Sequence, residues 1–65
     1  MAVLKTYTLY LRDHGDAVRF EPTLCSTDLD AMARSRALLD AHPECEAIEV
    51  FFGEERLFIV DRARL

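Results

Sequence analysis

Two histidines and two cysteines are the residues of this chain whose chemistry could make a site. They are His14, Cys25, His42 and Cys45. His42 and Cys45 have an H-x₂-C spacing, which is typical of half of a zinc site. The other half is missing, because His14 lies in a turn and Cys25 precedes a helix. That helix, of roughly fourteen residues, would hold the two cysteines about 21 Å apart. We therefore predict no metal, no cofactor and no disulfide, since a disulfide needs Cα atoms within about 7 Å.

The two thiols have a structural and a chemical interpretation. As small apolar residues they suit a core, and reduced thiols fit a cytoplasmic protein. The alternative is a reactive Cys25, because a helix N-terminus can lower the pKa of a nearby thiol. Thiol labelling of the folded protein separates the two interpretations.

Other catalytic groups have little support in the sequence. No G-x-S-x-G segment occurs, and the two glycines stand alone, so no glycine-rich phosphate cradle is expected. The acidic pair Asp28 and Asp30 suits the positive end of a helix dipole. The pair Glu54 and Glu55 is typical of a solvated hairpin tip. We therefore expect that the protein is not an enzyme.

Length and charge narrow the class of partner. The 65 residues are enough for one domain, residues 1–65, and the net charge is −4. The eight basic residues are scattered singly, so a nucleic-acid partner and an anionic membrane are both disfavoured. The opening Met1–Tyr7 does not resemble a signal peptide, and no apolar run approaches the roughly 20 residues of a membrane span. The expected location is the cytoplasm.

The elements that would position any site form a ββαββ order. Alternating apolar and polar residues predict strands, and a run of helix formers predicts a helix. Ser26, Thr27 or Asp28 can cap the helix start, and Pro43 stops it. Pro22 ends the second strand or places it at an edge. A turn is expected over 13–16, a hairpin loop over 53–56 and a polar tail over 61–65. The expected strands are 3–11, 17–21, 46–52 and 57–60, and the expected helix is 28–41.

The predicted fold class is α+β, with an antiparallel sheet of about four strands and one helix packed on one face. The strand order is not readable from the sequence. The helix side facing the sheet should carry Ser35 as a small residue that allows close approach, and Leu29 at its margin. The rest of that side comprises Ala31, Met32, Leu38 and Leu39.

One sheet face is left without a helix, and it is not clearly polar. If the covered face takes Tyr7, Leu9, Val18, Phe20, Ile48, Val50 and Phe52, several large apolar residues point away. About 600–800 Å² of exposed apolar surface is unusual for a stable monomer. The alternative is that the tail covers these residues. We predict an interface made by Leu4, Tyr10, Phe51 and one of the pairs Leu57/Ile59 or Phe58/Val60, with Leu57 and Ile59 as the pair we favour.

Three segments carry a family resemblance. They are Y-x-L-Y-L-R-D, A-M-A-R-S-R-A-L-L-D-A-H and I-E-V-F-F-G-E-E-R-L-F. Together they resemble short uncharacterised alphaproteobacterial proteins, which pair such a strand with an Ala-rich helix and an "IEVW-x-G-x-R" hairpin. The resemblance implies the fold and brings no activity. The opening order is also similar to that of HicB-type antitoxins, which usually have a G-C-F-T-like segment where this chain has residues 23–27.

The expected function is a small protein-interaction module that associates with itself, as a homodimer, or with another protein. The contact would use the open sheet face or an edge strand. Two alternatives remain at the level of sequence. One is an antitoxin-like or nucleic-acid-linked regulatory subunit, and the other is a small-ligand site completed across a dimer.

Overall fold

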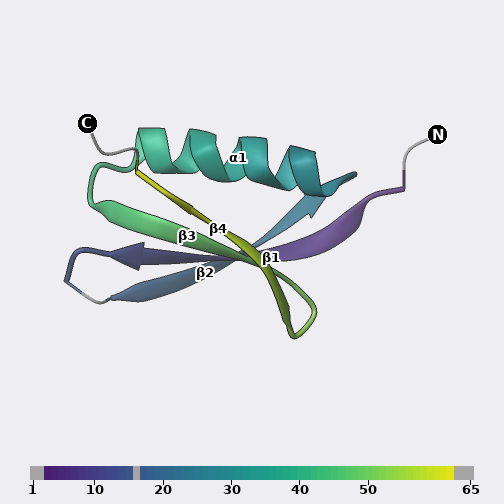
Figure 1. The fold of residues 1–65 in the computed structure, drawn as a ribbon, viewed down its shortest axis with the longest axis horizontal. Coiled ribbons are helices and arrows are strands. Elements are labelled where there is room, and N and C mark those ends of the chain that lie inside the picture. Colours follow the sequence, from purple (N-terminus) through teal and green to yellow (C-terminus); the bar gives the residue numbers. More distant parts are fainter. Residues whose placement is uncertain (1–2, 16, 63–65) are drawn as a thin grey trace.

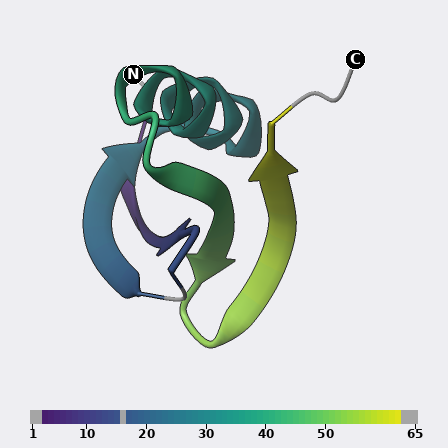
Figure 2. The same cartoon turned by 90° about the vertical axis from the view of Figure 1, so that its left-hand side faces the viewer.

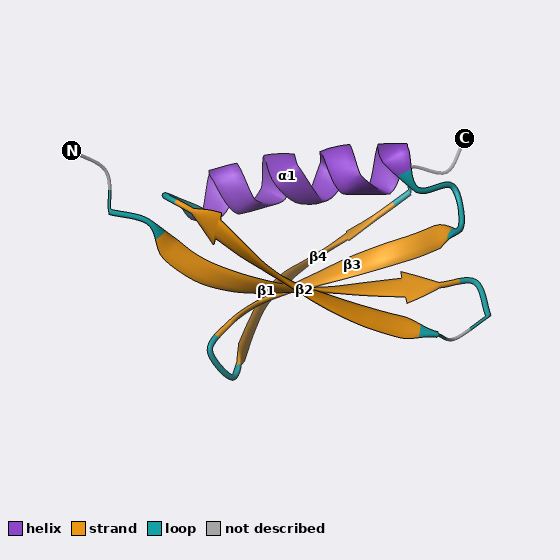
Figure 3. Cartoon of the chain, turned by 180° about the vertical axis from the view of Figure 1, so that it is seen from behind, coloured by secondary structure: helices purple, strands orange, loops and turns teal. Residues whose placement is uncertain are grey.

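The computed structural model describes residues 3–15 and 17–62 of the chain. Its strands pair antiparallel in the order β2-β1-β3-β4, and the helix lies along one side of the sheet (Figure 1). Seen from behind, the same side carries the helix and the other side carries strands alone (Figure 3). The predicted α+β fold with ββαββ order is confirmed. The elements are β1 (Lys5–Asp13), β2 (Val18–Cys25), α1 (Asp28–Ala41), β3 (Cys45–Phe52) and β4 (Glu55–Asp61).

Helix α1 has the bounds that the sequence predicts. Thr27 is the N-cap among the three candidates, and its hydroxyl accepts a hydrogen bond of 3.1 Å from the Asp30 backbone N–H. Asp28 and Asp30 lie in the first turn, where the helix dipole favours negative charge. The helix ends at the C-cap His42, directly before Pro43.

The view along the helix shows α1 lying over one side of the sheet (Figure 2), and the buried core residues lie between them. The buried row of α1 is Ala31, Ser35 and Leu39, spaced four residues apart. Ser35 is confirmed as the small buried residue, and its hydroxyl donates to the Ala31 carbonyl at 2.8 Å. Met32 was expected in this row but is exposed, because the covered stripe is narrower than the predicted arc. The sheet contributes Tyr7, Leu9, Leu11, Cys25, Cys45, Ile48, Val50 and Val60.

Strand β2 is longer than predicted. It was expected over 17–21 and runs over Val18–Cys25, passing through Pro22. Pro22 pairs with Thr8 of β1, and β2 is an edge strand of the sheet. An edge strand tolerates proline because one side of the strand has no ladder to donate to. The proline therefore marks the edge and does not end the strand.

The second hairpin is tighter than the predicted loop over 53–56. Phe52 pairs with Glu55, so only Gly53 and Glu54 connect the strands. Gly53 has φ +62°, which suits a two-residue hairpin turn. Strand β4 therefore starts at Glu55 and not at residue 57. The pairing shifts after Val50 and leaves Leu57 without a partner on β3, which makes a β-bulge.

The predicted polar tail is ordered where the structure describes it. Strand β4 continues to Asp61, and the Arg62 guanidinium donates to three backbone carbonyls near the end of α1. The Arg62 side chain therefore lies on the helix side of the sheet. Residues 63–65, and Asp16 of the predicted first turn, lie outside the described residues.

Candidate functional site: the open sheet face

The open face is the side of the sheet opposite α1. In an antiparallel pair, residues directly opposite each other point to the same side. The register pairs Tyr10 with Phe20 and Glu49, and pairs Phe51 with Arg56. The open face therefore comprises Thr6, Thr8, Tyr10 and Arg12 of β1, Val18, Phe20, Pro22 and Leu24 of β2, Ala47, Glu49 and Phe51 of β3, and Arg56, Ile59 and Asp61 of β4.

An aromatic row crosses three strands of this face. The rings of Phe20 and Tyr10 lie 6.0 Å apart, and those of Tyr10 and Phe51 lie 4.9 Å apart in an edge-on arrangement. Tyr10 and Phe51 are half-buried, whereas Phe20 is 69% exposed. Aromatic pairs at these separations attract each other beyond the area that they bury. The row is a preformed apolar centre with one freely accessible ring.

Strand β2 has its apolar side turned away from the helix. Val18 and Phe20 were expected on the covered face, but the register puts them on the open face. The side of β2 nearest α1 carries Arg19, Glu21 and Thr23, and the last two line a hollow beside the helix. The register of the first hairpin decides which side chains of β2 face α1. The Asp13 backbone N–H donates a hydrogen bond to the Ala17 carbonyl at 2.8 Å, and this hydrogen bond fixes the length of the loop.

Three paired charges lie beside the aromatic row. Glu49 accepts hydrogen bonds from Arg12 at 3.0 Å and from Arg56 at 3.1 Å. The hydrogen bond from Arg12, followed by that from Arg56, lowers the pKa of the Glu49 carboxyl below its usual value. The Glu49 side chain is mostly covered by its partners. The triad pairs one carboxylate with two guanidinium groups, which leaves a net charge of +1 within the open face.

The residues predicted for an interface lie on different parts of the molecule. Tyr10, Phe51 and Ile59 lie on the open face. Leu57, at the bulge, packs against the core. Leu4 precedes β1 and is exposed, outside the paired register. Sequence reasoning missed the largest exposed group of the face, Val18, Phe20 and Leu24 of β2. The length of the first hairpin loop was the signal that could have found them.

Both cysteines are buried and form no disulfide. Burial raises the pKa of the Cys25 thiol and of the Cys45 thiol above the usual value. This argues against the alternative of a reactive Cys25, since the thiolate is the reactive species. In the described part of the chain, no three His, Cys, Asp or Glu side chains converge as metal ligands would.

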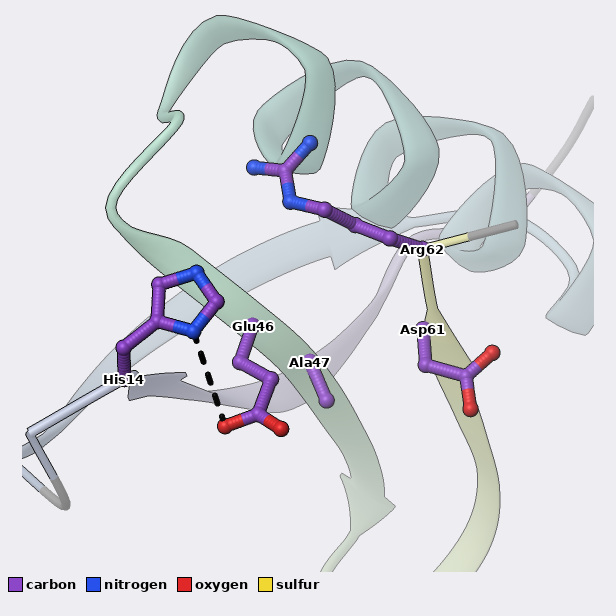
Figure 4. A pocket seen from close by; sticks show the side chains of 5 residues that line it. All are labelled: His14, Glu46, Ala47, Asp61 and Arg62. Carbon is purple, nitrogen blue, oxygen red and sulfur yellow. Dashed lines mark ion pairs between the residues drawn. The ribbon is translucent and has the colours of Figure 1, made fainter. Parts of the chain in front are cut away.

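A hollow of about 330 Å³ lies at the end of the sheet where β1 and β4 finish. Its walls include His14 and Glu46, whose Nδ1 and carboxylate lie 4.0 Å apart (Figure 4). Asp61 points away from the Arg62 guanidinium, which reaches toward the helix. That guanidinium is engaged by backbone carbonyls, at 2.9 Å from Cys45 O. Among the described walls of the hollow, the Arg62 guanidinium is therefore engaged, whereas His14, Glu46 and Asp61 are exposed.

No protein-family model, no curated protein and no solved structure matches the chain. The resemblance to short alphaproteobacterial proteins therefore stays a prediction. Among the described residues, no helix has the length and apolar character needed to cross a membrane.

Proposed function

We propose that this chain is a non-catalytic protein-interaction module that works in the cytoplasm and binds a partner protein through its open sheet face. The observation that carries the proposal is the orientation of β2. The solvent-exposed face of an antiparallel sheet normally carries polar side chains. Here Val18, Phe20 and Leu24 point outward and remain exposed. Such a patch marks a contact surface when it is contiguous with other apolar groups, as it is with Tyr10.

The face is a better docking surface than either edge of the sheet. Pro22 lies in the β2 edge and lacks a backbone N–H for an added strand. The β4 edge carries the exposed charged residues Glu55, Arg56 and Asp61. Prolines and charges on edge strands oppose strand addition. Buried free thiols also fit a reducing compartment.

Site-directed photo-crosslinking in cells that make the protein tests this proposal. A benzophenone side chain replaces Phe20, and a matched control replaces Leu29, which is 75% exposed on α1. The proposal expects protein adducts from position 20 and few from position 29. It is overturned if position 20 gives no protein adduct, or if its adducts are with nucleic acid.

A further inference from the structure

We infer that the partner on the open face is a second copy of this chain, packed sheet to sheet about a two-fold axis with the row Phe20, Tyr10 and Phe51 at its centre. The inference rests on the proposed function and names the occupant of the surface. It follows from the dimensions, the charge and the apolar pattern of the face.

The dimensions of the face favour a second sheet. Four strands spaced about 4.8 Å apart, each of seven to nine residues at about 3.3 Å per residue, give this side of the sheet roughly 500 Å² in projection. A stable interface buries about 800 Å² of accessible surface on each partner. An occupant must therefore cover nearly the whole side. A single helix or strand covers only a strip of it, whereas a second copy has a face of equal size and equal twist.

The charges of the face suit a copy of itself. The open face carries Arg12, Arg56, Glu49 and Asp61, which sum to zero, although the chain has a net charge of −4. A basic partner would be drawn to the remaining surface, where the excess negative charge lies. Two copies meet on this face without net repulsion. Glu49 is already paired with both arginines, which reduces the cost of removing these charges from water.

The apolar groups reach both margins of the face. Phe20 and Leu24 lie on β2 at one margin, and Ile59, which is 48% exposed, lies on β4 at the other. A face-to-face dimer buries both margins, whereas an edge-to-edge dimer through β2 leaves Ile59 in water. In a two-fold dimer each residue is used twice, so one substitution removes two contacts.

Sedimentation equilibrium of the purified full chain tests the inference, over about 10 µM to about 1 mM. The wild-type mass should approach twice the 7.5 kDa of one chain. Phe20→Ser should weaken the dimer roughly 30-fold or more, as expected for an aromatic anchor that is used twice in a two-fold dimer. Leu29→Ser, the matched control on α1, should sediment as the wild type does. Ile59→Ser should weaken the dimer several-fold.

The outcomes separate this inference from the proposed function. A wild-type monomer throughout the range overturns the dimer, while protein adducts from position 20 would still support a different partner. A dimer that Ile59→Ser and Phe20→Ser leave unchanged overturns the face-to-face geometry. If Phe20→Ser fails to give the wild-type circular dichroism spectrum, Ile59→Ser on the opposite margin decides the question alone.

Discussion

Tyr7 connects the middle of the sheet to the start of the helix. Its ring is buried, and its hydroxyl donates to Asp28 Oδ1 at 2.7 Å. Asp28 lies in the first turn of α1, so one hydrogen bond joins β1 to the helix N-terminus. The hydrogen bond to the Asp28 carboxylate, together with burial, raises the pKa of the Tyr7 hydroxyl to about 12. The neutral phenol is therefore the form that the fold requires.

This shift predicts a loss of stability at high pH. Because the folded-state pKa lies above the ordinary 10.0, the contribution is complete below about pH 10 and is lost as the pH rises toward 12. Tyr7→Phe removes the ionisable group. We expect its urea midpoint to fall less between about pH 8 and pH 11 than that of the wild type. Equal falls in the wild type and in Tyr7→Phe would contradict the role of Tyr7.

The end of helix α1 is completed by a residue from outside the helix. The last turn of α1 contains no basic side chain. Arg62, which follows β4, donates to the carbonyls of Leu39 at 2.8 Å, His42 at 2.6 Å and Cys45 at 2.9 Å. A cation at this position offsets the negative end of the helix dipole. It also adds a second donor to the Leu39 and His42 carbonyls, which accept from the backbone N–H groups of His42 and Cys45. Arg62 thus fastens β4 and β3 to α1.

Arg62→Ala should accordingly destabilise the protein by about 2 kcal/mol, since it removes charged hydrogen bonds to partly buried carbonyls. The control is Arg36→Ala, which deletes the same charge but only an exposed hydrogen bond of 3.2 Å to the Asp61 carbonyl. That change should cost about 0.5 kcal/mol. Urea unfolding at neutral pH measures both. Similar losses for the two variants would show that Arg62 has no special role at the helix end.

The elements show which features local sequence can predict. Thr27 and Pro43 act within one turn of the helix ends, so both bounds of α1 were predicted. The covered side of β1 was also predicted, because Tyr7, Leu9 and Leu11 alternate strictly. The predicted orientation of β2 was wrong, because the alternation shows that Val18 and Phe20 share one face of the strand but not which face of the sheet that is. The orientation comes from the hairpin register, which depends on the backbone closure of the turn.

The candidate site was only partly predictable for the same reason. Tyr10 and Phe51 follow from the alternation of β1 and β3 once the core side is known. Leu57 was placed with Ile59 because a regular strand alternates, but the bulge in β4 shifts Leu57 to the core. Arg62 gave no local signal, since its partners lie about twenty residues away in the sequence.

At the scale of the whole molecule, one helix covers one face of a four-stranded sheet. A chain of 65 residues buries only about 60% of the surface that its unfolded form exposes. The core here lies in one layer between α1 and the sheet, and the second sheet face adds its own apolar row without a cover. Small domains commonly gain stability from a disulfide, a metal or a partner. In the described part of this chain the cysteines are unbonded and no metal-ligand cluster is present. The proposed association through the open face would cover this apolar row and add a second buried layer.

Association through the open face should be coupled to folding of the chain. If the folded dimer is the stable species, unfolding releases two chains and the Tm depends on protein concentration. A tenfold rise in concentration adds about 1.4 kcal/mol per dimer, or about 0.7 kcal/mol per chain, which raises the Tm by roughly 3–6 °C for a domain of this size. Phe20→Ser should lower the Tm at a given concentration and reduce its dependence on concentration, whereas Leu29→Ser should leave both unchanged. Thermal unfolding followed by circular dichroism measures the Tm, and a wild-type Tm that does not change with concentration would contradict the coupling.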